Sequence, residues 1–421
     1  MNYGRIFRGP LKLFALPGAE EYVAKVAKWL AKNYLKEIGE SPTSLVNFFN
    51  MDEDEAKFMD SFEGTKEEFL QQYLVGSFNY FTHRNGAIEI SITKSCRGKD
   101  VYLFHTFSET DIVDYNKNPK RLNLSDQEVL LYNALDAFSE AKVGYITLIE
   151  MNLGQARSDR PKGRGACNLR TFFRNITANG CNHFVVYQIH SAKSLIGLDS
   201  TKIFYDNLRG ENLLKKYILR SYVKKLETFN TLVANEWVFS SVDAGGKEFA
   251  AQFSKVFKAP LLVVDKRRNS LTNNIDEITI LKPENLSLEG KIIYIVDDMI
   301  DSGGSILDVC RKYKELGAKE VNVVAFYGLF SHPAEERLSK LYNDGIINKI
   351  IITDLVTHDK EFYERNPYIV VSDTSYTTAR VIQKTNNGGS LEKYFTGLNA
   401  ENYLKKIESN RFLNFSSDDG D

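Results

Sequence analysis

The chain has 421 residues, which is long for a single hydrophobic core and favours two domains. Hydrophobic residues make up 43% and charged residues 26%, a composition typical of a globular protein rather than a disordered or membrane-embedded one. The 54 Lys and Arg balance 55 Asp and Glu, giving a net charge of −1. No general attraction to nucleic acid or to acidic lipid is expected, so any basic site must be local.

Cysteine usage and terminal composition indicate the compartment. Cys96, Cys167, Cys181 and Cys310 have no spacing typical of metal ligands, which favours free thiols in a reducing environment. The first residues lack a signal-peptide pattern, and no later run is long and apolar enough to span a bilayer. We therefore expect a soluble, cytoplasmic protein without a membrane partner.

Apolar runs and helical patterns alternate along the chain. An apolar run at residues 11–16 precedes a segment in which apolar side chains recur at helical spacing: Val23, Val26, Ala27, Leu30 and Tyr34. Further short runs rich in Val, Ile and aromatic residues follow at 101–107, 145–151, 183–189, 261–265, 291–298, 321–328 and 350–354. Apolar strands separated by helices predict parallel sheets covered on both faces, the doubly wound α/β class.

Two polar stretches interrupt this alternation. Residues 36–76 include an acidic run and the segment 65–74, which we predict to be helical, and residues 111–125 are polar. Both are interpreted as surface insertions. The acidic end at 416–421 is expected to fray.

The segment 291–317 has the clearest chemical pattern. An apolar strand ends in Asp297 and Asp298, a turn follows, and a helix is predicted from about Ile306 to a terminating Gly317. The turn contains Asp301, Ser302, Gly303, Gly304 and Ser305. A glycine-bearing loop between a strand and a helix N-terminus is typical of phosphate binding, because loop amides converge on the anion. Carboxylates beside a phosphate suit sugar hydroxyls or a cation, whereas the alternative is an acidic strand end with an ordinary glycine turn.

This motif resembles the phosphoribosyl-diphosphate motif shared by type I phosphoribosyltransferases and ribose-phosphate pyrophosphokinases. Five further segments resemble the pyrophosphokinase family, in that family's order: residues 84–107, 155–194, 242–270, 327–338 and 372–389. The resemblance covers most of the chain except the insertions and the tail. A phosphoribosyltransferase is disfavoured because the similarity outside the loop is to the pyrophosphokinases.

The resemblance implies two similar, phosphoribosyltransferase-like α/β domains with mostly parallel sheets and the active site between them. We place the first at 1–205, with the insertion at 36–76 and completed by 372–405. The second spans 206–371, and 406–421 is a flexible tail. The family's adenine site draws on two subunits, which implies a homodimer or a larger homo-oligomer.

The implied reaction is attack of a ribose 1-hydroxyl on the β-phosphorus of ATP, with AMP leaving. Lys266 and Arg268, in a run of three cations after an apolar strand, match the family's catalytic pair; a solvated basic turn is the alternative. The loop residues that match the ribose-phosphate site are Asp297, Asp298, Asp301, Ser302, Gly303, Gly304 and Ser305.

Other positions match the family's ATP and metal sites. Phe81 and Asn85 correspond to adenine-binding positions, and Arg157, Ser158 and Asp159 to further ATP contacts. His190 and Asp243 match the magnesium positions, where the ion bridges ATP phosphates. A histidine at a strand end is more often structural, and manganese remains an alternative to magnesium.

Several positions depart from the family pattern. Ala87 replaces an acid, Ser158 a Gln, Gln188 an Asp and Ala244 a His. Ser302 and Ser305 stand where Thr is usual, and residues 193–199 replace a Gln-x-x-Gly-Phe-Phe stretch.

Three hypotheses for the function follow. The acceptor is ribose 5-phosphate, giving phosphoribosyl diphosphate, or it is ADP-ribose, giving an activated ADP-ribose for NAD rebuilding. The third is a non-catalytic regulatory relative. The sequence leaves allosteric control and the role of the insertion open.

Overall fold

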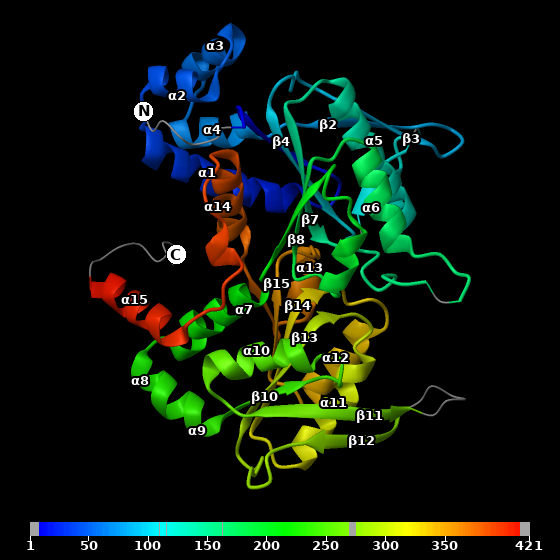
Figure 1. The fold of residues 1–421 in the computed structure, drawn as a ribbon, viewed down its shortest axis with the longest axis vertical. Helices are drawn as coiled ribbons and strands as arrows, with labels where there is room; N and C mark the ends of the chain where they lie inside the picture. Colours follow the sequence, from blue (N-terminus) through cyan, green and yellow to red (C-terminus); the bar gives the residue numbers. More distant parts are fainter. Residues whose placement is uncertain (1–7, 109, 115, 162, 269–274, 413–421) are drawn as a thin grey trace. The chain divides into compact units, whose positions relative to one another are not determined.

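The computed structural model describes residues 8–108, 110–114, 116–161, 163–268 and 275–412 (Figure 1). The chain divides into two units. Unit 1 contains residues 1–208, 355–357 and 373–395, and unit 2 contains residues 209–354, 358–372 and 396–421. Both are α/β units with mostly parallel sheets, as the sequence predicts.

Unit 1 is built on a five-stranded parallel sheet with the strand order β1-β4-β7-β8-β9. The unit as a whole contains the strands β1 (Leu11–Ala15), β2 (Phe78–Thr82), β3 (Ile88–Ile92), β4 (Asp100–Thr106), β5 (Thr110–Val113), β6 (Pro119–Leu122), β7 (Tyr145–Asn152), β8 (His183–Tyr187) and β9 (Phe204–Leu208), of which β2–β3 and β5–β6 form separate hairpins. Its helices are α1 (Glu20–Ile38), α2 (Pro42–Phe49), α3 (Glu53–Ser61), α4 (Lys66–Leu74), α5 (Leu124–Glu140), α6 (Asn168–Ala178), η1 (Ala192–Gly197), α14 (Ser375–Asn386) and η4 (Glu392–Tyr394).

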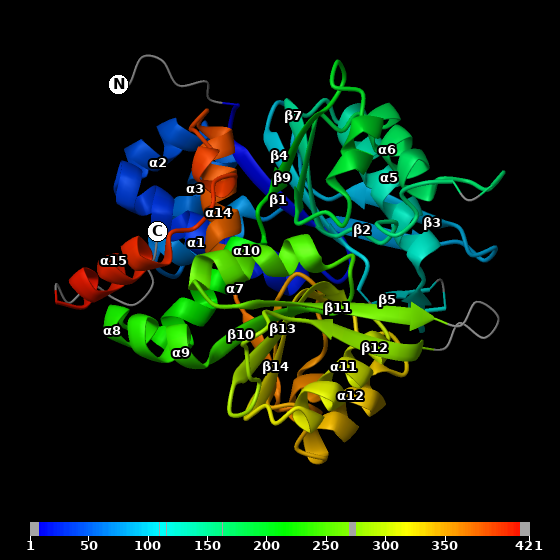
Figure 2. The same cartoon turned by 60° about the horizontal axis from the view of Figure 1, so that its bottom comes forward.

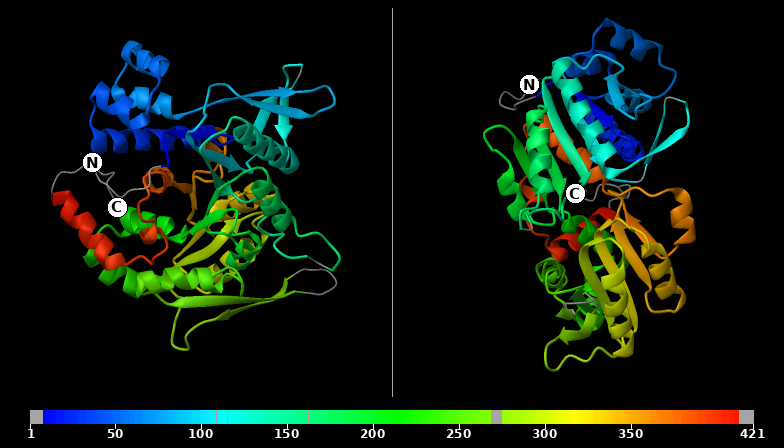
Figure 3. Two further views of the ribbon diagram at one scale, coloured as in Figure 1. Left: turned by 45° about the horizontal axis from the view of Figure 1, so that its top comes forward. Right: turned by 90° about the vertical axis from the view of Figure 1, so that its right-hand side faces the viewer.

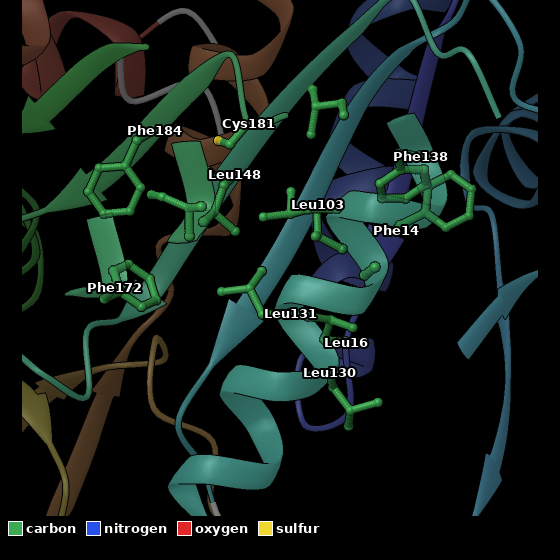
Figure 4. Packing of buried hydrophobic residues seen from close by; sticks show 14 of the residues in the cluster. Phe14, Leu16, Leu103, Leu130, Leu131, Phe138, Leu148, Phe172, Cys181 and Phe184 are labelled. Atoms are coloured by element: carbon green, nitrogen blue, oxygen red, sulfur yellow. The ribbon is translucent and has the colours of Figure 1, made fainter. Parts of the chain in front are cut away.

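Helices cover both faces of this sheet. Side chains of α5 and α6 pack with β4, β7 and β8 in one apolar cluster; Figure 4 shows Leu131 of α5 near Leu103 of β4, and Phe172 of α6 beside Phe184 of β8. On the other face, α1 lies against α14, and the five residues predicted for the apolar face of α1 are all buried. Removing these side chains from water is the main stabilising term for the unit.

The predicted insertion folds into three short helices. Asp52 with Glu55, and Thr65 with Glu68, form reciprocal capping boxes that begin α3 and α4, so the helix predicted at 65–74 is confirmed. After α4, Val75 bridges to Leu13, which covers part of the edge strand β1. The polar stretch at 111–125 contributes to the hairpin β5–β6. This hairpin contacts β2–β3, and both project beyond the five-stranded sheet (Figure 3).

Unit 2 contains a seven-stranded sheet with the strand order β12-β11-β10-β13-β14-β15-β16. Its strands are β10 (Trp237–Ser241), β11 (Leu261–Arg268), β12 (Ile275–Leu281), β13 (Ile292–Ile300), β14 (Glu320–Gly328), β15 (Lys349–Thr353) and β16 (Ile369–Ser372). Its helices are α7 (Glu211–Ile218), η2 (Leu219–Val223), α8 (Leu226–Thr228), η3 (Phe229–Val233), α9 (Ala234–Glu236), α10 (Lys247–Phe257), α11 (Gly304–Glu315), α12 (Ala334–Asn343), α13 (Lys360–Arg365) and α15 (Ala400–Phe412).

The sheet of unit 2 is parallel except for the edge strand β12, which runs antiparallel to β11. Helices α11, α12 and α13 share an apolar cluster with β13, β14 and β15, whereas α7 and α10 contact the sheet from the opposite face (Figure 2). Both faces are therefore covered, which explains why the central strands consist almost entirely of buried apolar residues.

The C-terminal end differs from the prediction. Residues 396–405, predicted to complete the first domain, lie in unit 2, where Asn212 donates to the carbonyl of Thr396. Residues 406–412 of the predicted flexible tail belong to α15, and Glu408 in this helix accepts the amide of Leu226. Residues 413–421 lie outside the described part of the chain. Among the described helices, none is long and apolar enough to cross a membrane.

Candidate active site

The predicted phosphate loop follows the central strand of unit 2. Strand β13 continues through Asp297 and Asp298 to Ile300, two residues further than the sequence predicts, because its outer end still pairs with β14. The turn is half-buried, and Gly303 adopts a left-handed φ of 70° immediately before α11. A side chain at that φ would be strained, so glycine allows the chain to enter the helix directly. The helix ends before Gly317, which is also left-handed, as predicted.

Two carboxylates lie side by side where β13 approaches the loop. The Oδ1 atom of Asp297 accepts the amide of Asp298 at 3.0 Å. Burial, the largest cause, and the negative charges of Asp298 and Asp243 together raise the pKa of Asp297 to about 8, with that hydrogen bond acting in the opposite direction. Repulsion between desolvated carboxylates favours a bound proton, a sugar hydroxyl or a cation.

Asp243 follows the neighbouring strand β10 in an exposed turn. Its Oδ1 atom accepts the amides of Gly245 at 2.9 Å and Gly246 at 3.1 Å, which fixes the carboxylate. A Cβ atom on Gly246 would lie 3.7 Å from Oδ1 of Asp297, so the turn lies close to the β13 carboxylates. The ends of adjacent parallel strands thus bring Asp243 and Asp297 together, where α/β sheets bind ligands.

Lys266 reaches the phosphate loop from β11. Its Nζ atom donates to the carbonyl of Ser305 at 2.8 Å, and its charge partly opposes the rise in pKa that burial causes at Cys310. The ammonium therefore lies at the first turn of α11, beside the predicted phosphate site. Arg268 ends the backbone of β11, but its side chain lies outside the described residues.

Helix α12 packs against the phosphate loop through Arg337 and Leu338. Nη1 of Arg337 donates to the carbonyl of Ser302 at 2.9 Å, and a Cβ atom on Gly303 would meet Leu338 at 3.6 Å. The sequence pattern did not identify Arg337, because it lies more than 30 residues after the motif on a separate helix. Its position within the family-like segment 327–338 was the available signal.

In unit 1, the residues predicted for adenine binding lie on the hairpin β2–β3. Phe81 is 55% exposed, and its ring contacts that of His83 edge-on at 4.8 Å. The side-chain oxygen of Asn85 accepts the amide of Ala87 at 3.1 Å and shapes the hairpin turn. An exposed aromatic face beside an amide suits a purine.

The remaining unit 1 positions follow adjacent strands. Arg157, Ser158 and Asp159 come after β7, and His190 comes after β8, which ends as Gln188 adopts a left-handed φ of 46°. Arg157 and His190 are exposed. The hydroxyl of Ser158 accepts the amide of Asn168 at 3.3 Å, so this side chain also supports the start of α6.

Across the described residues, no three His, Cys, Asp or Glu side chains are grouped to hold a metal ion on their own. The carboxylate of Asp243 is nevertheless an oxygen donor of the kind that Mg²⁺ prefers, and it lies close enough to Asp297 to raise the pKa of that residue. These residues fit a cation that takes most of its ligands from water and from substrate phosphates.

Comparisons with known proteins identify relatives of this chain. A family model described as the phosphoribosyl transferase domain matches residues 215–360. The chain is 30% identical over 315 residues to the chloroplastic ribose-phosphate pyrophosphokinase 2 of Oryza sativa subsp. japonica, covering 74% of this chain and 69% of the relative. It is 31% identical over 281 residues to the ribose-phosphate pyrophosphokinase of Clostridium acetobutylicum, covering 66% of this chain and 77% of the relative.

The fold is also similar to that of a solved structure. The phosphoribosylpyrophosphate synthetase from Mycobacterium smegmatis aligns with a TM-score of 0.65 at 20% identity, covering 90% of this chain and 100% of that one. The sequence identity to the two pyrophosphokinases confirms the resemblance seen in the sequence: this chain belongs to the ribose-phosphate pyrophosphokinase family.

Proposed function

We propose that this protein transfers the pyrophosphoryl group of ATP to the 1-hydroxyl of ribose 5-phosphate, forming phosphoribosyl diphosphate and releasing AMP. The observation that carries the proposal is the loop at 297–305. It combines a left-handed glycine at a helix start with paired carboxylates and the Lys266 ammonium. Loop amides suit the 5-phosphate, and the carboxylates suit the ribose hydroxyls.

In this proposal the residues Asp297, Asp298, Asp301, Ser302, Gly303, Gly304 and Ser305 bind the ribose phosphate. Lys266 and Arg268 stabilise negative charge on the transferring group, which is the main protein contribution to phosphoryl transfer. Lys266 already lies at the loop, 2.8 Å from the carbonyl of Ser305, and a short swing of its flexible stem would bring the ammonium to a bound phosphate.

We assign Phe81, Asn85, Arg157, Ser158 and Asp159 to ATP binding, and His190 with Asp243 to Mg²⁺. This assignment rests on the sequence resemblance; the exposure of Arg157 and His190 after adjacent strands supports it. When bound, Mg²⁺ would neutralise phosphate charge. The protein's own part is to hold Asp243 in place through the amides of Gly245 and Gly246.

We also propose that the protein acts as a homo-oligomer in the cytoplasm. The large exposed ring of Phe81 supports a second copy at the β2–β3 hairpin, because an exposed aromatic residue on a projecting hairpin is available for docking. The four cysteines are buried free thiols, in keeping with a reducing compartment. Light scattering would test the assembly by comparing the wild-type protein with Phe81→Ser, which should have a lower molar mass. A monomer mass for both the wild type and the variant would contradict the proposed oligomer.

ADP-ribose is the second candidate acceptor. Ala87, Ala244, Ser302 and Ser305 are smaller than the residues usual in the family, which would leave room for a larger 5′-substituent. The product would be an activated ADP-ribose able to accept nicotinamide. The third candidate, a non-catalytic relative, is disfavoured because Lys266 and the loop carboxylates are retained.

The deciding experiment measures AMP release from ATP and Mg²⁺ with ribose 5-phosphate or ADP-ribose as acceptor. The proposed function predicts release with ribose 5-phosphate. Preference for ADP-ribose would support the second candidate. No AMP release with either acceptor, under Mg²⁺ or Mn²⁺, would support the non-catalytic one.

A further inference from the structure

Arg337 makes a specific contact with the phosphate loop that the proposed reaction leaves unexplained. It projects from the first turn of α12, is itself half-buried, and its Nη1 atom donates to the carbonyl oxygen of Ser302 at 2.9 Å. A hydrogen bond from a charged donor is stronger than one between neutral groups. The guanidinium therefore holds one particular peptide of the loop.

The held peptide joins Ser302 to Gly303. Because a trans peptide is planar, its carbonyl oxygen and its amide hydrogen point in opposite directions. Fixing the Ser302 oxygen toward α12 therefore turns the Gly303 amide away from α12. An amide that points away from the supporting helix is available to an anion on the other side of the loop.

The loop backbone packs closely against α12 around this contact. A Cβ atom on Gly304 would lie 3.3 Å from Nη1 of Arg337, and one on Gly303 would lie 3.8 Å from Cα of Ala334 and 3.6 Å from Leu338. The loop backbone thus rests directly on the first turn of α12. Gly303 is required by its left-handed φ of 70°, and Arg337 supplies the polar part of the contact with α12.

We propose that Arg337 is a positioning residue of the phosphate loop: it orients the Ser302–Gly303 peptide toward the 5-phosphate of the substrate and places a permanent positive charge behind that peptide. This inference rests on the proposed function for the identity of the substrate. Arginine suits the role because its guanidinium remains charged and presents several donors in one rigid plane.

The test compares Arg337→Met and Arg337→Lys with the wild-type protein, with KM measured separately for ribose 5-phosphate and for ATP. Arg337→Met should raise the KM for ribose 5-phosphate by about 10- to 100-fold, the effect of losing one charged hydrogen bond, and leave the KM for ATP within about 2-fold. Arg337→Lys should recover part of this loss. Arg365→Met is the matched control, because exposed Arg365 also bonds to α12, through Glu335 at 3.0 Å, without reaching the loop.

The outcomes separate this inference from the proposed function. If ribose 5-phosphate turns over but Arg337→Met keeps a wild-type KM, or both KM values rise equally, the positioning role is wrong while the function stands. If ribose 5-phosphate does not turn over, the function is wrong, and calorimetry with inorganic phosphate then tests the loop alone. Weaker phosphate binding by Arg337→Met supports the inference, and unchanged or undetectable binding in both proteins overturns it.

Discussion

Lys266 extends from β11 to the first turn of α11, where its ammonium donates to the Ser305 carbonyl. Replacing it with Ala removes the ammonium that lies at the start of α11. We expect kcat to fall by about 10²- to 10³-fold, because charge on the transferring group would lose a preorganised partner. Thermal unfolding should be nearly unchanged, since the side chain is only half-buried. AMP release and a melting curve check both parts.

Lys282→Ala is the matched control for that experiment. Its Nζ atom also donates to a backbone carbonyl, that of Leu286 at 2.7 Å, but the side chain is exposed and lies after β12. This variant should retain wild-type activity. A wild-type rate in Lys266→Ala, or an equal loss in Lys282→Ala, would contradict the assignment of Lys266.

The raised pKa of Asp297 leads to a prediction of how the stability of the protein depends on pH. This pKa is raised from 3.8 to about 8 in the folded protein, so between these values the folded state holds a proton that the unfolded chain has released. Stability should therefore fall as the pH rises from about 4 to about 8 and level off above that range. Asp297→Asn removes this titration and should be more stable than wild type at pH 8.5 by at least about 1 kcal/mol.

Denaturant unfolding between pH 5 and pH 9, in buffer free of substrate and divalent cations, measures this difference. The gap between the two proteins should close toward pH 5, where Asp297 is protonated in the folded state. Asn keeps one acceptor oxygen but loses the negative charge and the second acceptor oxygen of the carboxylate, so the stabilised variant should lose activity. Parallel stability profiles for the two proteins would show that the pKa of Asp297 is not raised in the folded state.

The residue scale also shows the limit of prediction from sequence. The loop and Lys266 were found because they lie in short contiguous motifs, whose chemistry depends on local spacing. Arg337 was not found, because its role arises from the packing of α12 beneath a loop formed by a different segment. The residues assigned to ATP and Mg²⁺ remain predictions.

At the scale of elements, the predicted strands of both sheets are present, and the residues predicted at helical spacing between Val23 and Tyr34 lie in α1. Long apolar patterns were predictable because a buried face requires a regular period. The edge strand β9 and the π-helical turns η2 and η3 were not predicted. Residues 204 and 205 of β9 are exposed, and the register of a π turn depends on its neighbours, so neither leaves a clear periodic signal.

The apolar face of α1 leads to a prediction for that helix. Leu30 is fully buried within it, so Leu30→Ala should leave a cavity and lower the free energy of unfolding by about 2–5 kcal/mol. Lys28→Ala lies two residues away on the exposed face and should change stability by less than about 0.5 kcal/mol. Urea unfolding of both variants measures the difference, and similar values would contradict the assignment of the buried face.

At the scale of the whole molecule, neither unit is a continuous segment. The chain leaves unit 1 after residue 208 and returns at 355–357 and 373–395, which supplies α14. Helix α14 is joined to unit 1 by buried hydroxyl contacts: Thr378 lies 2.6 Å from the Tyr22 hydroxyl and 2.8 Å from that of Tyr187. These contacts link residues more than 180 positions apart, so the sequence placed α14 in the first domain only through the family resemblance.

Thr378→Val keeps the shape of the side chain but removes its hydroxyl from both phenols, a loss that should cost about 1–3 kcal/mol. We expect the change to loosen unit 1 selectively, and the buried thiols report on each unit: Cys181 lies in unit 1 and Cys310 in unit 2. A thiol reagent should label Cys181 faster in the variant and Cys310 at the wild-type rate, with peptide mapping to separate the two. Thr377→Val, at the half-buried neighbouring position, should leave both rates unchanged. Equal acceleration at both cysteines would contradict a selective effect on unit 1. Cys310 belongs to the apolar cluster of unit 2, which contains no residue of α14, so its faster labelling would mean that the two units open together.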